Sequence, residues 1–215
     1  MEGHAALPEL EAVSWRRPVD ERWLRLREAV SAAYTGVYCL PFVVLGIALV
    51  LLEPLLFPVS LVSFLHAWVI PELFAYRGAR VVLPGSPSPH SRAESAAQGL
   101  LGDLLGHQER ELQRSTGLAP ERGTLGTWLV GEAGALMVRP GGRRIHTFCA
   151  RVTEPGLPPS DRIAHLLLAL REDERGFATV ANHAFAGGAW RIRRRLPKRQ
   201  RLALDRARQL PARAP

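Results

Sequence analysis

Two long uncharged stretches dominate the pattern of hydrophobic and polar positions in this chain of 215 residues. The first covers residues 30–52 and the second residues 54–71, and only Glu53 separates them. The hydrocarbon core of a bilayer is about 30 Å thick, so a spanning helix needs about 20 mainly apolar residues. Both stretches meet this requirement, and Pro54 suits the first position of a helix. The pattern predicts a transmembrane helical hairpin over residues 34–76.

The residues that flank the two stretches predict how the hairpin is oriented. Five arginines precede the first stretch and three follow the second, whereas the turn between them carries only Glu53. Because arginine-rich flanks stay in the cytoplasm, we expect a multi-pass protein of the cell (plasma) membrane with both termini cytoplasmic. A cleaved signal peptide does not fit, since about 30 mostly polar residues come first and a second span follows.

The N-terminal segment, residues 1–33, combines two kinds of sequence. Residues 1–14 are expected to lack regular structure. Arginines alternate with Trp23, Leu24 and Leu26 further on, a pattern typical of an amphipathic helix that lies on the membrane surface. We expect this interfacial helix to lead into the first span.

Two ionisable residues lie in or beside the second stretch. An ionisable side chain at membrane depth is costly and is therefore a candidate functional group. His66 is either a proton-carrying or ligand-binding group or a neutral side chain bonded to Ser63 or a carbonyl, and the second interpretation is favoured. Glu72 is expected at the interface, solvated and close to Arg77.

A small cytosolic α+β domain is expected to follow the hairpin. Residues 83–90 consist almost entirely of Pro, Gly and Ser, so residues 77–90 are predicted to be a linker. The next 100 residues, 91–190, are close to the usual size of a domain. The expected domain comprises a helix, a three-stranded antiparallel meander and two helices.

The elements of this domain follow from apolar spacing and turn residues. Helical spacing covers residues 91–116 and ends at Gly117, and again residues 161–171 after Ser160. A further short helix is predicted over residues 173–185. Glycine-containing turns separate the runs that predict strands, which are residues 127–130, 135–138 and 144–152.

The net charge of +8 is concentrated at the C-terminus. Residues 191–215 hold ten basic residues and one acidic residue, and part of this Arg-rich tail is predicted to be helical. Anionic lipid headgroups attract such a segment with about 1 kcal/mol per basic residue. The alternative is a solvated, partly disordered terminus. The candidate headgroup-binding residues are Arg191, Arg193, Arg194, Arg195, Lys198, Arg199 and Arg201.

Candidate catalytic residues are few. His107 and Glu111 are one helical turn apart, and His146 and Cys149 lie on one predicted strand. No His-Glu-x-x-His or paired Cys-x-x-Cys pattern accompanies them, so neither a metal nor a cofactor is predicted. His146 and Cys149 should point to opposite faces of the strand, which disfavours a nucleophile-base pair. Cys39 and Cys149 lie in different environments and offer no disulfide framework.

The order helix, three strands, helix resembles the layout of double-stranded-RNA-binding domains. That family carries a basic cluster at the start of its last helix. Residues 158–162 of this chain have the sequence PPSDR there instead. Nucleic acid is therefore an unlikely partner.

Several segments together resemble uncharacterised actinobacterial integral membrane proteins with two spans. They are YTGV at residues 34–37, LEPLLFP at 52–58, LVGEAGALMVRPGG at 129–142 and LREDERGFATVAN at 170–182. The chain also has 27 arginines and a single lysine, which indicates a GC-rich bacterial genome. The resemblance implies a bacterial source and a two-span topology, and it implies no activity, cofactor or site residue.

Two functional hypotheses from different classes remain. The first is a non-enzymatic, membrane-anchored binding or regulatory module that faces the cytoplasm and contacts the bilayer, with a protein partner in the membrane or the cytosol. The second is a membrane-tethered enzyme that acts on a lipid or small substrate. It requires the fold to bring His107, Glu111, His146 and Cys149 together in an open pocket.

Overall fold

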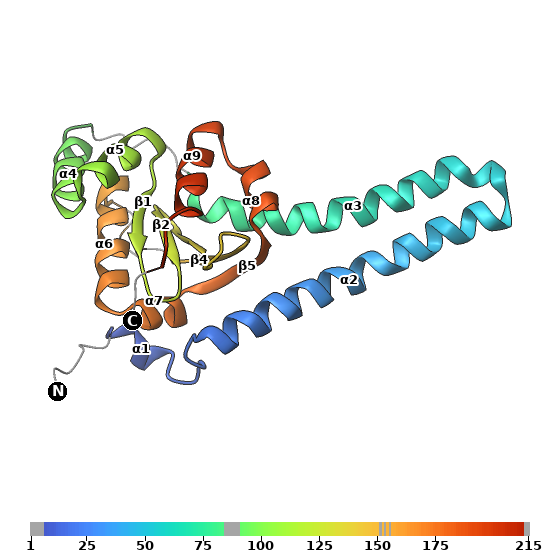
Figure 1. Cartoon of the computed structure of the whole chain (residues 1–215), viewed down its shortest axis with the longest axis horizontal. Coiled ribbons are helices and arrows are strands. Elements are labelled where there is room, and N and C mark those ends of the chain that lie inside the picture. Colours follow the sequence, from blue (N-terminus) through green and yellow to red (C-terminus); the bar gives the residue numbers. More distant parts are fainter. Residues whose placement is uncertain (1–6, 84–90, 151, 153, 155, 213–215) are drawn as a thin grey trace.

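The computed structural model describes residues 7–83, 91–150, 152, 154 and 156–212. Two long helices project from a small α+β domain (Figure 1). The helices are α1 (Glu9–Ala12), α2 (Glu21–Leu52), α3 (Phe57–Ala79), α4 (Ser91–Leu104), α5 (His107–Thr116), α6 (Pro159–Glu172), α7 (Glu174–Val180), α8 (Ala189–Arg195) and α9 (Lys198–Ala207), with short 3-10 turns η1 (Pro54–Leu56) and η2 (Arg80–Val82). The strands are β1 (Ala119–Arg122), β2 (Thr127–Gly131), β3 (Gly134–Val138), β4 (Arg144–Cys149) and β5 (Asn182–Gly188).

Helices α2 and α3 form the predicted hairpin, and each is long and apolar enough to cross a membrane. Most large apolar side chains between Val30 and Leu73 are exposed along it. The two helices contact each other through small residues: Gly46 lies against the ring of Phe64, and Ser60 is fully buried. These properties suggest a membrane protein, as the sequence predicts.

Helix α2 begins at the domain and not at the first apolar stretch. Asp20 caps it by accepting a hydrogen bond from the Trp23 amide at 2.6 Å. Leu24 is fully buried in the domain core together with Val19. The amphipathic helix predicted here is the first part of α2 and leads into the first span as expected, with Leu24 packed against protein and Leu26 exposed. Its place on the membrane surface stays a prediction. Residues 9–12, expected to be irregular, form the short helix α1.

The sheet has five antiparallel strands in the order β1-β2-β3-β4-β5. The three predicted strands are β2, β3 and β4, at the centre of the sheet. The expected three-stranded meander did not include the two edge strands, β1 and β5. Strand β1 is short and contains Pro120, which pairs with Leu129. Strand β5 is made largely of Ala, Gly and His, and its residues 182–185 had been assigned to a helix. Neither edge strand has the β-branched composition that marks a strand in sequence.

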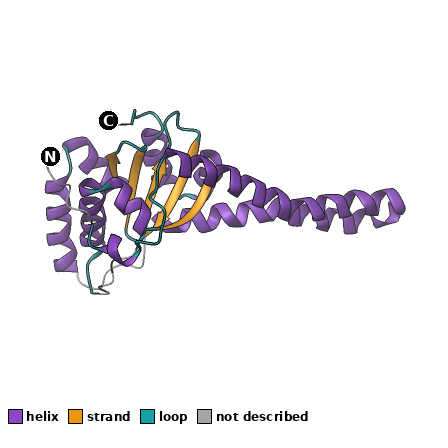
Figure 2. Cartoon of the chain, turned by 90° about the horizontal axis from the view of Figure 1, so that it is seen from below, coloured by secondary structure: helices purple, strands orange, loops and turns teal. Residues whose placement is uncertain are grey.

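Each face of the sheet is covered by helices (Figure 2). One face packs against α4, α6, α7 and the start of α2 around the buried Trp128 and Phe148. The other packs against the end of α3, η2, α8 and α9 around Leu136, Ile145 and Ile192. The alternation along β4 places His146 and Phe148 on the first face and Ile145 on the second. The base of the hairpin thus contributes to both cores.

Three further expectations are corrected by the structure. The helix predicted over residues 91–116 is divided into α4 and α5 because Gly106 adopts an extended conformation between them. The helix expected in the Arg-rich segment is present as α9, but the segment also forms α8 and buries Leu196 and Leu204 against the sheet, so its residues 191–212 are not a solvated tail. Of the linker predicted over residues 77–90, residues 84–90 lie outside the described residues, and the first part belongs to α3 and η2.

Candidate functional site

The four candidate catalytic residues lie on two separate elements. His107 and Glu111 are on α5, which packs beside β1 and α9. His146 and Cys149 are on β4, three strands away from β1 in the sheet order. Neighbouring strands are about 4.8 Å apart, so β1 and β4 are separated by about 14 Å. The fold therefore does not place the pair on α5 next to the pair on β4. Within the second pair, His146 and Cys149 lie on opposite faces of the sheet.

The two ionisable residues of the second span have different environments. His66 donates from Nδ1 to the carbonyl oxygen of Val62 at 2.8 Å and stacks on Phe42. Glu72 is buried, with 7% of its surface exposed, and forms an ion pair with Arg195. The expectation that Glu72 is solvated near Arg77 is wrong, because α8 folds back onto the end of the hairpin.

The basic residues of α8 and α9 are partly engaged within the protein. Arg193 binds both carboxylate oxygens of Asp205, and Arg201 donates to the Leu196 carbonyl at 2.9 Å. The guanidinium groups of Arg191 and Arg194 lie 5.1 and 4.9 Å from the ring of Trp190. Lys198 and Arg199 are exposed at the start of α9.

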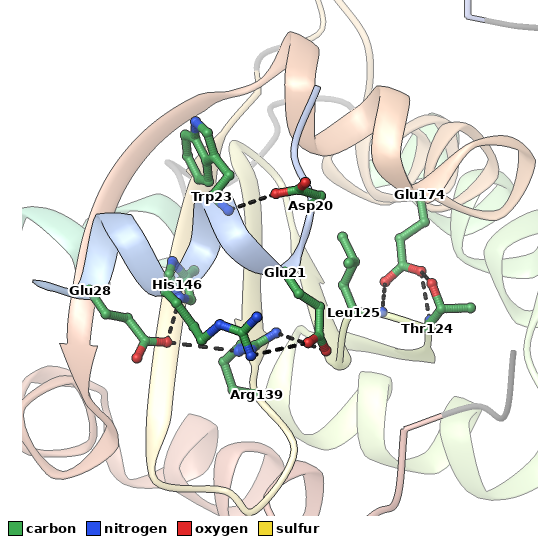
Figure 3. Close-up of polar contacts among 10 residues, drawn as sticks. Asp20, Glu21, Trp23, Glu28, Thr124, Leu125, Arg139, His146 and Glu174 are labelled. Carbon is green, nitrogen blue, oxygen red and sulfur yellow. Dashed lines mark hydrogen bonds and ion pairs between the residues drawn. The ribbon is translucent and has the colours of Figure 1, made fainter. Parts of the chain in front are cut away.

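A chain of three polar side chains connects α2 to the sheet. His146 is completely buried, and both of its ring nitrogens have partners. Its Nε2 lies 3.0 Å from Oε1 of Glu28, and its Nδ1 lies 3.1 Å from Nε2 of His183 on β5. Figure 3 shows Glu28 reaching from α2 toward His146, with Arg139 nearby. One consistent set of tautomers has His183 donating to His146 and His146 donating to Glu28.

The protonation of the two histidines follows from their burial. Burial lowers the pKa of His146 below its ordinary value, although the hydrogen bond to Glu28 opposes this effect. Burial also lowers the pKa of His183 to about 3, and the neighbouring His146 and Arg27 act in the same direction. Both rings are therefore neutral near pH 7, and the negative charge of Glu28 is balanced by arginines.

Arginines at the two ends of the β3–β4 turn surround Glu28. Arg139 and Arg144 approach its carboxylate to 3.8 and 3.9 Å. Arg139 also approaches Glu21, two turns earlier on α2, to 3.8 Å. Contacts of this length are electrostatic and not close hydrogen bonds, so they position α2 over β3 and β4 without saturating the arginines.

A cleft of about 530 Å³ opens beside Glu28, at the base of the hairpin. Its walls come from α2, α3, the β3–β4 turn, β5 and the start of α8. Small or apolar residues, including Gly36 and Pro71, line the side toward the two spans. Arg144 and Arg191 are among the residues that line the other side. The volume is in the range typical of small-molecule sites, and the lining is apolar at one end and cationic at the other.

Metal chemistry finds no support in the side chains that the structure describes. Among them, no group of three or more His, Cys, Asp or Glu residues is placed to hold an ion. Both cysteines are free thiols, and Cys39 donates to the Ala67 carbonyl at 3.3 Å. The cleft, with its charged and apolar ends, is the candidate site.

The sequence singled out His146 of the polar chain and Arg191 of the cleft, but not the other charged residues of this site. Glu28, His183 and the pair Arg143-Arg144 come from three different parts of the chain, and they become neighbours through the pairing of β4 with β5 and the packing of α2 against β4. The adjacent arginines after Gly141-Gly142 were the one available signal, since a hairpin turn presents both of them at a sheet edge. Comparisons with family models, curated proteins and solved structures give no match for this chain.

Proposed function

We propose that this protein is an integral membrane protein whose α+β domain faces the cytoplasm and acts as a binding or regulatory module at the membrane surface. The observation that carries the proposal is the cleft, because it lies at the junction of the hairpin and the domain. A ligand in this position contacts both the bilayer-spanning helices and the sheet. Its binding is therefore communicated to the domain.

The exposed surface of the hairpin supports the membrane location. Large apolar side chains such as Val37, Leu51 and Leu61 have half or more of their surface exposed. Burying apolar surface is favourable by about 25 cal/mol per Å², so an uncovered hairpin would associate or aggregate in water. Lipid covers this surface, and α2 residues 30–52 provide the length for one crossing at about 1.5 Å per residue.

The distribution of arginines supports the orientation. Arg143, Arg144 and Arg191 join the flanking arginines at the base of the hairpin, while the tip carries Glu53. Positive charge is retained on the cytoplasmic side. Trp190, half exposed at the same level, suits the headgroup region. Both termini are then cytoplasmic, and Lys198 and Arg199 face the anionic leaflet or a partner.

Cysteine labelling tests the location and orientation. In a background with Cys39→Ser and Cys149→Ser, Leu55→Cys places a thiol at the tip and Leu202→Cys places one on α9. Both positions are exposed. A membrane-impermeant maleimide applied to intact cells should label Leu55→Cys and should label Leu202→Cys only after permeabilisation. Equal labelling of both, or recovery of the chain in the soluble fraction, refutes the proposal.

A membrane-tethered enzyme acting on a lipid or small substrate is the second candidate. The observation in its favour is that Glu28 lines the cleft and is hydrogen-bonded to His146, an arrangement that acid-base chemistry uses. Against it, His146 is fully buried and has both nitrogens engaged. Turnover of a lipid by the purified protein that is abolished in Glu28→Gln would favour the enzyme.

A further inference from the structure

The cleft at the base of the hairpin contains unpaired positive charge. Arg143 is exposed, and its side chain makes no hydrogen bond or ion pair with any described residue. Arg144 has only the 3.9 Å contact with Glu28, and 52% of its side chain is exposed. Arg191 stacks on Trp190 and leaves its N–H groups unbonded to described residues. Three arginines and one carboxylate therefore line the cleft, and the carboxylate, Glu28, also has Arg139 and His146 as partners.

The opposite end of the cleft is apolar and lies within the predicted hydrocarbon region. It is formed by Gly36 and Cys39 of α2 and by Pro71 and Phe74 of α3. A side chain added at Gly36 would meet no atom within 4 Å, so the cleft is open there. An uncovered apolar cavity beside a membrane span is accessible to an acyl chain. The two ends together match an amphiphile with an anionic head.

We propose that this cleft binds one anionic phospholipid of the surrounding membrane, with its phosphate at Arg143, Arg144 and Arg191 and an acyl chain along Gly36 and Pro71. Guanidinium groups bind phosphate through paired N–H donors. Trp190 covers the glycerol region as an interfacial aromatic residue. This inference rests on the proposed membrane location and names the ligand of the same site.

The site differs from a general attraction between the basic helices and the leaflet. Arg193 and Arg195 are held by Asp205 and Glu72, so they are poor candidates for a specific phosphate site. The arginines of the cleft, Arg143, Arg144 and Arg191, come from the β3–β4 turn and α8. Because they line one cleft, a single phosphate that contacts all three must lie inside it. A lipid in this position joins both spans to β5.

The test uses the full-length protein, purified in a neutral detergent after extraction from membranes. Phosphatidylglycerol is added, and the number of lipids bound per chain is counted by native mass spectrometry. The rise in melting temperature measures how strongly this binding stabilises the protein. Wild type should retain about one phosphatidylglycerol per chain, and phosphatidylcholine should not substitute. The triple variant Arg143→Gln/Arg144→Gln/Arg191→Gln should bind at least about tenfold more weakly, the loss expected for three contacts to one phosphate.

A matched triple variant removes the same charge elsewhere. Arg92, Arg114 and Arg175 are exposed, and their side chains make no hydrogen bond or ion pair with described residues. Arg92→Gln/Arg114→Gln/Arg175→Gln should bind phosphatidylglycerol as wild type does. Equal weakening in the two triple variants would mean that binding follows total charge, and the cleft assignment would be overturned.

A second pair of variants tests the apolar end without changing charge. Gly36→Leu fills the cleft and should reduce lipid retention, whereas Gly99→Leu places the same side chain on α4, at another glycine with open space around it. Equal retention in both would remove the acyl-chain part of the proposal. A melting-temperature rise of the same size with inorganic phosphate alone would identify a soluble anion site and overturn the lipid assignment.

These outcomes are separate from the failure of the proposed function. The location of the chain is established first, from its extraction behaviour and from the labelling of Leu55→Cys. A chain in the membrane that retains no phosphatidylglycerol refutes the lipid site alone. A chain that is soluble without detergent refutes the membrane location.

Discussion

Glu72, at the end of the second long helix, accepts hydrogen bonds from two guanidinium nitrogens of Arg195 on α8, one of them at 3.0 Å. The two residues are 123 positions apart, and this contact fixes the hairpin to the domain. Glu72 is 7% exposed, so its charge is removed from water and depends on this partner.

Breaking the pair should destabilise the protein more than breaking an exposed pair. We expect Arg195→Gln to lower the free energy of unfolding by about 2 to 3 kcal/mol, because it leaves the carboxylate of Glu72 buried without its counter-charge. Arg193→Gln breaks the exposed pair with Asp205 and should cost under about 1 kcal/mol. Thermal unfolding in detergent compares them. Equal losses would show that burial of Glu72 does not determine the cost.

Glu174 should be a second point of high sensitivity. Its carboxylate accepts hydrogen bonds from the Thr124 amide and hydroxyl and from the Leu125 amide, at 2.6 to 3.1 Å (Figure 3). It also accepts one from the indole N–H of Trp128 at 2.6 Å. Glu174→Ala leaves these donors without partners, so we expect a loss of about 2 to 4 kcal/mol in unfolding free energy. Glu172→Ala, at an exposed position in the same region, is the control and should change stability by under about 0.5 kcal/mol.

The pattern of hydrophobic residues was sufficient for the coarse fold. The prediction of two long apolar helices near the N-terminus, followed by a small α+β domain with an antiparallel sheet, is confirmed. The hairpin and α6 were predictable because an uninterrupted apolar run and a regular apolar face are local properties of the chain. The three central strands were found for the same reason.

The edges of the sheet and the packing of the basic helices were not predictable in this way. Strand β5 pairs with β4, yet its Ala and Gly residues carry no strand preference of their own. Helix α9 looked like a charged tail because Ala203, Leu204 and Ala207 form a narrow apolar face among arginines. The Glu28–His146 contact spans 118 residues, and no local pattern encodes it.

The buried His146 and the half-buried His183 predict loss of stability in acid. His183 has its pKa lowered to about 3, and burial also lowers the pKa of His146. In the unfolded chain both titrate near pH 6.5, so below that pH the unfolded state binds protons that the folded state excludes. The free energy of unfolding should therefore fall as the pH is lowered from about 6.5 toward 3. Above about pH 7 the contribution of these two histidines should no longer change with pH.

Replacing His183 tests the assignment. His183→Gln keeps an N–H donor for His146 but cannot be protonated, so the fall in stability between about pH 7.5 and 5 should be smaller, by up to about 1.4 kcal/mol per pH unit. His165→Gln, at an exposed position on α6, should leave the steep fall in place. Denaturant unfolding at several pH values measures this. A variant whose pH dependence equals that of wild type would show that His183 is protonated in the fold.

The last prediction concerns the contact between the two long helices. A Cβ atom at Gly46 would lie 2.8 Å from the Phe64 ring, whereas a Cβ atom at Gly36, on the same helix, would meet nothing within 4 Å. Leucine has a higher helix propensity than glycine by about 0.8 kcal/mol, so at an open position it should be tolerated or stabilising. Gly46→Leu instead forces the ring of Phe64 out of its site and separates the helices. In detergent without added lipid, we expect Gly46→Leu to lower the melting temperature and Gly36→Leu to keep or raise it. The two substitutions are chemically identical, so equal melting temperatures would mean that the helices do not pack at Gly46, and the hairpin geometry would need to be revised.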